Sequence, residues 1–379
     1  MDATHADLLQ SVPVGERCPH CGPRLEDKGH LDRSVLDVEP LRRQWIQSQL
    51  EQKYCPRCQR AVSARAPGGL PRHLLGNRLL AHVAVQHYVF GVTLGQLENQ
   101  LGVGYGTRVG ALHGLARRFE PGIERLARDY RRAPVKHADE TGWRTDGHNG
   151  YAWLFCTETI SLFRFRQSRS GQIAQQVLGV RRLEGVLVVD RYHGYNRAPC
   201  ALQYCYAHLL RDVEDLEKEF PSQPEIQRFV AALAPLLARA MQLRGLKLSA
   251  GQFRQQAAQT RAEIEAVTSA SAQHPAIQKI QNLFREKAGR RYHWARDRSI
   301  PADNNRAERE LRPLVIARKL SFGSQAEAGA RTREVLMSVL HTLRKRTDDV
   351  TAAFQRILDR LAADERADPY KLLLRCDSS

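Results

Sequence analysis

The sequence predicts an α/β core that a helical insertion interrupts and that helical segments flank. Three observations favour this fold class. The apolar run Val186–Val189 shows no alternation, as expected of a strand buried on both faces of a sheet. Shorter strand candidates separated by turn residues precede it. The long stretch between Asp190 and Glu308 has apolar residues at helical spacing and little strand character.

Two C-x-x-C pairs stand near the start of the chain, Cys18 with Cys21 in CPHCG and Cys55 with Cys58 in CPRCQ. Each pair brings two thiolates to one ion from a tight turn, and two pairs complete a tetrahedral site. We therefore predict a structural Zn²⁺ in a zinc-ribbon-like module within residues 1–65, with a strand pair or a strand and turn between the cysteine pairs. Disulfides or redox motifs are the alternative, which a reducing compartment disfavours.

Charge indicates the class of partner. Lys and Arg total 58 against 41 acidic residues, a formal net charge of +17. Such a balance favours a polyanion, and nucleic acid before a membrane because the basic residues are dispersed. A merely soluble basic protein is the alternative. The sequence has no apolar run of membrane-spanning length and no secretory signal at its start, so we expect a cytoplasmic protein.

Residues 66–132 are predicted to be helical and to resemble a helix-turn-helix. Thr93 is a candidate N-cap, and Gly102 stands where a turn between two helices favours glycine. In a DNA-binding unit the second helix would offer Tyr105, Thr107 and Arg108 to a groove. An ordinary αα-hairpin explains the pattern about as well.

Residues 133–210 are predicted to form the first part of the catalytic core. Three antiparallel strands, a helix and a parallel central strand follow one another, which is the order of the ribonuclease-H-like fold. In that order the first and fourth strands are neighbours, so Asp139 and Asp190 should meet at their ends. Glu140 would point to the opposite face and serve the structure. The predicted elements are Val135–Ala138, Tyr151–Cys156, Leu162–Arg166, Gln172–Leu178 and Val186–Val189.

Beyond the core we expect a helical insertion at 211–298, a second part of the core with the catalytic Glu at 299–330, and C-terminal helices at 331–379. Cys205 and His208 lie three residues apart, on one helix face at the start of the insertion. They could be half of a metal site, but the sequence shows no second half. A structural role beside the active site is the favoured interpretation.

Glu308 begins a predicted helix in DNNRAERELRP, which Pro313 should end or kink. Asn305 and Glu308 also fit a capping box, which alone would explain the carboxylate. The surrounding cations favour a further role, because they would provide phosphate-binding charge. We therefore predict DNA contacts by the following residues: Arg306, Arg309, Arg312, Arg318 and Lys319. Asp139, Asp190 and Glu308 together offer hard oxygen ligands suited to Mg²⁺ or Mn²⁺.

The motifs CPHCG…YCPRC, HADET, VVDRYHGYN, YCYAHLLRD and IPADNNRAERELRPLVIARKLSFGS occur in the order seen in transposases of the insertion-sequence-66 family, which this chain resembles. The resemblance implies a DDE transposase with Asp139, Asp190 and Glu308 as the catalytic triad. It implies that Cys205 and His208 match the family's C-x-x-H motif, and that Arg318 and Lys319 lie near bound DNA.

A DDE transposase binds the terminal inverted repeats of its element and catalyses strand cleavage and strand transfer. Our hypothesis is that Asp139 bridges two ions, Asp190 holds one, and Glu308 holds the other and orients water. The implied partners are double-stranded DNA, further copies of the chain, and accessory proteins of the same element, at the bacterial nucleoid. A zinc-dependent DNA-binding regulator or domesticated transposase, and a ribonuclease-H-like nuclease, are the alternatives.

Overall fold

The computed structural model describes residues 16–28, 43–71 and 73–375. Its contacts divide the chain into two units, Met1–Gln47 and Ser48–Ser379. In the first unit, Arg17 and Arg24 form an antiparallel bridge around the first cysteine pair. In the second unit, strands β1 (Gln52–Cys55) and β2 (Arg60–Ser63) form a hairpin around the second pair. The strand pair, or strand and turn, predicted between the cysteine pairs falls partly outside the described residues. In its described part, 43–54, the start of β1 is the regular structure, beginning at Gln52.

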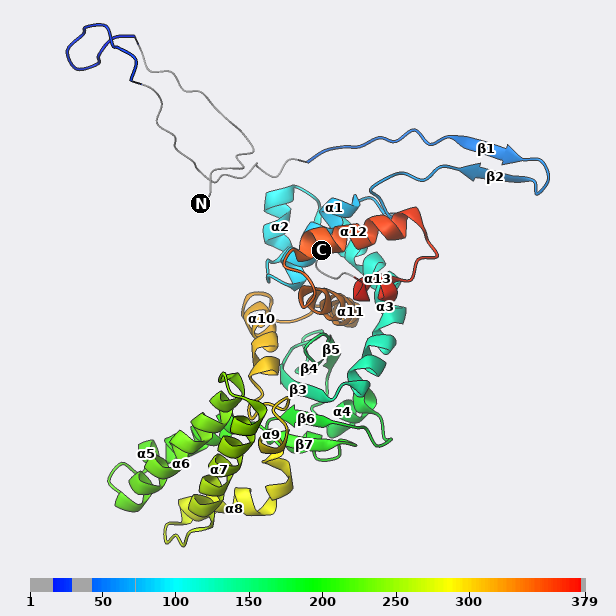
Figure 1. The fold of residues 1–379 in the computed structure, drawn as a ribbon. Helices are drawn as coiled ribbons and strands as arrows, with labels where there is room; N and C mark the ends of the chain where they lie inside the picture. Colours follow the sequence, from blue (N-terminus) through cyan, green and yellow to red (C-terminus); the bar gives the residue numbers. More distant parts are fainter. Residues whose placement is uncertain (1–15, 29–42, 72, 376–379) are drawn as a thin grey trace. The chain divides into compact units, whose positions relative to one another are not determined.

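The second unit is organised on a five-stranded mixed sheet of order β5-β4-β3-β6-β7 (Figure 1). β3, β4 and β5 pair antiparallel, whereas β6 runs parallel to β3, and β7 runs parallel to β6. The strands span Val135–Gly142, Tyr151–Cys156, Ser161–Arg166, Val186–Val189 and Ala201–Tyr204. All four residues of β6 are buried, as their unbroken apolar run predicts.

The predicted sequence of three antiparallel strands, a helix and a parallel strand is present. The helix is α4 (Gly171–Leu178), one residue longer than expected at its start. β7 was not predicted. Its four residues follow a Pro-Cys pair, and its strand character is too short to stand out from the helix start that comes next. β7 matters because it leads directly into Cys205.

Helices from both ends of the chain pack together against the sheet. α1 (Asn77–Tyr88) contacts α11 (Glu327–Arg344) and α12 (Val350–Ala363), while α3 (Tyr105–Arg132) contacts α11 and α13 (Pro369–Leu374). α11 also lies against β5. These helices share one hydrophobic core with the sheet, which includes Leu80, Leu115, Trp153 and Leu340.

α2 (Leu94–Leu101) precedes α3 and has the predicted ends. The Thr93 hydroxyl accepts the Gln96 N–H, and the Gln96 side chain returns to Thr93 N in a capping box. Gly102 has φ +58°, the left-handed conformation in which a residue without Cβ avoids strain.

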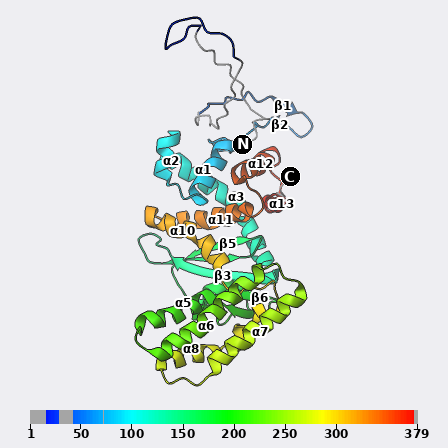
Figure 2. The ribbon, with the colours of Figure 1, turned by 60° about the vertical axis from the view of Figure 1, so that its left-hand side comes forward.

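The segment between the two parts of the core is helical, as predicted, and has its own hydrophobic core, which includes Leu209, Leu233 and Ile264. In Figure 2 its helices lie side by side in green to yellow. They are α5 (Tyr206–Glu219), α6 (Pro224–Gln242), α7 (Ala250–Ser269), α8 (Pro275–Glu286) and the short α9 (His293–Arg296).

α10 (Asn305–Ser321) then returns the chain to the sheet and contacts β3 and β4. Pro313 lies inside this helix and does not end it, which leaves a kink as the predicted alternative. Of its residues, Ala307, Leu311, Leu314 and Ala317 are buried. Their spacing of three to four residues orients the helix and leaves Glu308 on an adjacent face.

Candidate active site

Asp139 and Asp190 extend from neighbouring parallel strands. The β3–β6 pairing ends with His137 opposite Val188, and each aspartate stands two residues beyond that pair. Both side chains are half-buried and accept a local backbone N–H. Asp139 Oδ1 accepts from Glu140 N at 2.9 Å, and Asp190 Oδ1 accepts from Tyr192 N at 2.9 Å. The two carboxylates thus lie just beyond the last pair of the parallel β3–β6 ladder, and the ends of parallel strands commonly carry functional groups. Asp190 follows β6, but β3 continues to Gly142 beside β4, so the strand end expected at Ala138 is wrong.

The environment of Asp139 is unfavourable to an isolated negative charge. Burial raises the pKa of Asp139 to about 8, and the nearby carboxylates of Glu140, Asp190 and Glu308 contribute to the rise. Asp190 and Glu308 are therefore close enough to Asp139 for their negative charges to raise its pKa. A cluster of carboxylates that repel one another is a site that a cation would stabilise.

Asn304 holds α10 against β3. Its Nδ2 donates to Ala138 O at 2.9 Å, and its Oδ1 lies 3.0 Å from His137 Nδ1. The same residue is the N-cap of α10, and its carbonyl accepts the Glu308 N–H at 3.3 Å. Sequence reasoning missed Asn304, although it lies in the D-N-N run that starts this helix. It also missed the capping geometry, because Asn304 rather than Asn305 is the N-cap.

Cys205 and His208 do lie beside Glu308. Cys205 Sγ accepts the Asn304 N–H at 3.1 Å, and His208 Nδ1 is 3.7 Å from Glu308 Oε1. The ligand atoms of Cys205, His208 and Glu308 all lie within 4.8 Å of one another. The tertiary structure therefore brings Glu308, a third residue with a possible ligand atom, beside the pair.

Glu140, the neighbour of Asp139 in β3, has hydrogen-bond partners of its own. Its carboxylate accepts from Arg169 at 2.7 Å and from the Tyr195 hydroxyl at 2.5 Å. Burial raises the pKa of Glu140, and these two donors oppose the rise. The residue thus ties β3 to the segment that follows Asp190.

The predicted DNA contacts on α10 differ in exposure. Arg309, Arg312 and Lys319 are exposed, and they form no ion pair with any other described residue. Arg306 is half-buried. Arg318 is also half-buried and donates to Gly142 O at 2.7 Å, so it anchors the end of α10 to β3.

The prediction that Arg108 is offered to a groove is wrong. Its side chain has 0% exposed area and pairs with Glu98 at 2.8 Å. The helix α3 turns Arg108 inward against α2, whereas Tyr105 and Thr107 remain exposed. A DNA-reading role of α2 and α3 stays a prediction.

Each cysteine pair forms the expected tight turn within its own unit. The backbone N–H groups of His20 and Cys21 lower the pKa of Cys18. In the hairpin, the N–H of Cys58 lowers the pKa of Cys55. Such N–H donors favour thiolates, the form that binds metal. The four-cysteine zinc site stays a prediction.

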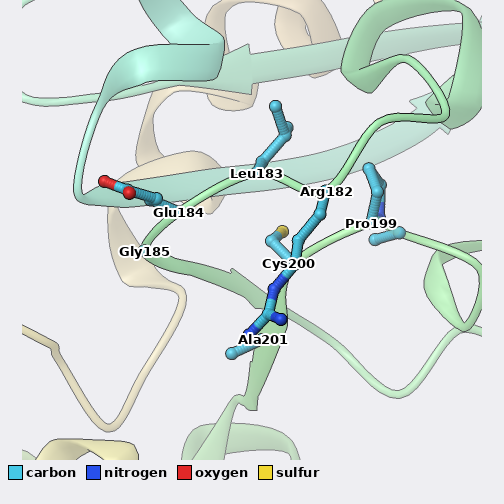
Figure 3. A pocket seen from close by; sticks show the side chains of 8 residues that line it. Arg182, Leu183, Glu184, Gly185, Pro199, Cys200 and Ala201 are labelled. Carbon is cyan, nitrogen blue, oxygen red and sulfur yellow. The ribbon is translucent and has the colours of Figure 1, made fainter.

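A cavity of about 870 Å³ lies at the opposite ends of β6 and β7, before these strands begin (Figure 3). It is lined by residues that precede these strands, among them Leu183, Glu184, Pro199 and Cys200. Because the carboxylates follow the other end of β6, this cavity is not part of the candidate active site.

In the described part of the chain, no helix has the length and apolar character needed to cross a bilayer.

Comparison with known proteins points to one family. The family described as "Transposase IS66 family" matches residues 72–332, which include the sheet, the insertion and α10.

Two relatives from Sinorhizobium fredii, strain NBRC 101917 / NGR234, match most of the chain. The uncharacterized protein y4jD is 24% identical over 397 aligned positions, covering 93% of this chain and 76% of the relative. The uncharacterized protein y4qI is 27% identical over 422 positions, covering 98% and 76%. The family match extends over well more than half of the residues, so the chain belongs to the IS66 family of transposases.

Proposed function

We propose that this protein is a DDE transposase with a ribonuclease-H-like core. It would bind the terminal inverted repeats of its element and catalyse DNA strand cleavage and strand transfer. The observation that carries the proposal is the convergence of Asp139 and Asp190 from adjacent parallel strands with Glu308 from α10. Membership of a transposase family supports the same reaction class.

The residues present fit Mg²⁺ or Mn²⁺. Their carboxylate oxygens are ligands that these hard ions prefer. The raised pKa of Asp139 supports the fit, because charge repulsion and burial there favour neutralisation by either a proton or a cation. Asp139, Asp190 and Glu308 would hold the ions, which supply Lewis acidity and stabilise charge on the entering and leaving oxygens of a phosphodiester.

The side chains of the protein then bind and orient the reactants. Glu308 would orient the attacking water, and later the 3′-hydroxyl, for in-line displacement. No protein nucleophile is required. Asn304 and Arg318, at the two ends of α10, would keep Glu308 in register with β3.

The exposed cations of α10 would bind the phosphate backbone beside the scissile bond. Arg309, Arg312 and Lys319 are three to ten residues apart on one helix and have no acidic partner among the described residues. Phosphate contacts of this kind fix the position of the duplex rather than read its sequence. Base recognition would come from the N-terminal zinc module of Cys18, Cys21, Cys55 and Cys58 or from the α2–α3 region.

The test is cleavage of labelled duplexes that carry the DNA flanking the gene, in Mg²⁺ or Mn²⁺. We expect nicking at a discrete end by the wild type and none by Asp190→Asn. Glu217→Gln, which makes the same change on the exposed face of α5, should cleave normally. DNA binding without cleavage by the wild type would favour the regulator. Cleavage without strand joining or end preference would favour the nuclease. Cleavage retained by Asp190→Asn would contradict the assignment.

A further inference from the structure

We propose that Cys205, His208 and Glu308 form a second metal site of the catalytic unit, for Zn²⁺ or a similar borderline ion. The site goes beyond the proposed function, since its thiol and imidazole are not needed to hold Mg²⁺ or Mn²⁺ at Asp139 and Asp190. Only its consequence for catalysis, through the shared Glu308, rests on that function.

The distances suit a single ion. Ligands at about 2.0–2.3 Å in tetrahedral arrangement are separated from one another by about 3.3–3.8 Å. His208 Nδ1 and Glu308 Oε1 lie 3.7 Å apart, and all three ligand atoms lie within 4.8 Å of one another. The Cys205 thiol thus needs only a small adjustment to complete a three-ligand set with one open position.

Two of the three ligand atoms lack any other partner. His208 Nδ1 and Glu308 Oε1 are both buried and without a hydrogen bond. Their separation of 3.7 Å is too long for a hydrogen bond to each other. Buried polar atoms without partners are costly and uncommon in folded proteins. A cation between them would satisfy both atoms at once.

The third ligand is a buried thiol. Burial raises the pKa of Cys205 to about 12, so a bound cation would be needed to hold it as a thiolate. Cys205 is the N-cap of α5, and its Sγ accepts the Asn304 N–H at 3.1 Å. A neutral thiol is a weak acceptor, whereas a thiolate accepts several N–H donors well. The C-x-x-H spacing then places His208 on the same face, one turn along the helix.

The donor set selects the ion. A thiolate and an imidazole favour Zn²⁺ over Mg²⁺, which prefers oxygen ligands and retains its water. Only Oε1 of Glu308 is used, so Oε2 is left for the ion held by the aspartates. The site would join α5 to α10 close to Asp190, because Cys205 N also donates to Val189 O at 2.9 Å. Zinc would thereby fix the orientation of Glu308.

The experiment uses the full-length chain in which Cys18, Cys21, Cys55 and Cys58 are replaced by serine, which removes the other candidate zinc site. After dialysis, zinc content is measured by mass spectrometry, and the sulfur ligands are counted by X-ray absorption. We expect one equivalent of zinc with one sulfur ligand, and a visible spectrum of tetrahedral type with Co²⁺. Further replacement by Cys205→Ser, His208→Ala or Glu308→Gln should weaken zinc binding at least about tenfold.

Cys200→Ser is the matched control, because Cys200 is a partly buried thiol next to β7 that faces neither Glu308 nor His208. It should keep its zinc. If the four-serine variant does not fold, the experiment is repeated with the four cysteines intact. The wild type should then bind two equivalents of zinc, and Cys205→Ser should bind one. Zinc content unchanged by Cys205→Ser, or absent from the folded four-serine variant, would overturn the site. Zinc binding is measured without DNA and therefore does not depend on the proposed function. If the wild type binds this zinc but never cleaves DNA, the proposed function is contradicted and the zinc site is not.

Discussion

Asn304 Nδ2 donates a 2.9 Å hydrogen bond to the carbonyl oxygen of Ala138, the residue immediately before Asp139. One buried side chain thereby links the strand that carries Asp139 to the helix that carries Glu308. The link is reinforced by His137 on one side and by the Cys205 thiol on the other. Asn304 acts through its neighbours, so its role in the proposed reaction is that of a positioning residue.

Replacing Asn304 by alanine should lower both stability and cleavage. The change leaves Ala138 O without its buried donor, which we expect to cost about 1–3 kcal/mol. Because Glu308 would lose its fixed position, half-maximal cleavage should require more Mn²⁺, a shift that a purely structural residue would not produce. Urea unfolding and cleavage across a Mn²⁺ titration check this. Asn282→Ala, on the exposed face of α8, is the control; equal metal requirement in both variants would argue against positioning.

The raised pKa of Asp139 predicts an unusual pH dependence. The folded protein keeps a proton on Asp139 up to a pKa of about 8, whereas the unfolded chain releases it near the usual 3.8. The folded state therefore binds more protons in this range, and its stability from this group falls as pH rises, by at most about 1.4 kcal/mol per pH unit. Asp139→Asn should abolish that fall.

The measurement is thermal unfolding in chelator at a series of pH values between about 5 and 8. The wild type should lose stability relative to Asp139→Asn as pH rises, and Mn²⁺ should restore it by replacing the proton. Parallel curves for the two proteins would mean that Asp139 is ionised normally.

The exposed cations of α10 should control DNA affinity through charge. Replacing Arg309, Arg312 and Lys319 by alanine should weaken binding to all duplexes and reduce the salt dependence of log K by about 2–3, since each phosphate contact contributes about 0.9. Filter binding or fluorescence anisotropy at several salt concentrations measures this. A matched triple variant at Arg228, Arg254 and Lys279, exposed on α6, α7 and α8, should change the slope less. An equal reduction would assign DNA binding to dispersed charge.

Glu334 is expected to be essential for stability. Its carboxylate has 1% exposed area and contacts Arg164, Arg166 and Arg331, so it joins α11 to β5. Glu334→Ala should cost about 3–5 kcal/mol, because the buried Arg164 would keep only Glu124 as a counter-charge and the buried Phe165 N–H would lose its acceptor. Chemical denaturation provides the value. Glu327→Ala, exposed at the start of the same helix, should change stability by less than about 0.5 kcal/mol.

Local patterns in the sequence were sufficient for most elements. The unbroken run Val186–Val189 predicted β6, and Thr93 with Gly102 predicted the two ends of α2. These features depend on neighbours a few residues away, which sequence periodicity and capping rules describe directly. Asp190 and Glu308 could also be selected, because Asp190 follows β6 and Glu308 lies in the first turn of α10. Asp139 was selected from a strand expected to end at Ala138, whereas β3 continues to Gly142 and contains it.

The tertiary structure alone decided which side chains meet. Nothing local distinguishes the buried Arg108 from an exposed arginine, because its partner Glu98 lies on another helix. The four residues of β7 are recognisable only once β6 is in place beside them. Cys205 and His208 meet Glu308 although about a hundred residues separate them. They meet because β7 ends directly before Cys205, and the Asn304 N–H at the start of α10 donates to the Cys205 sulfur. Long-range packing of a shared apolar core, rather than local preference, brings such groups together.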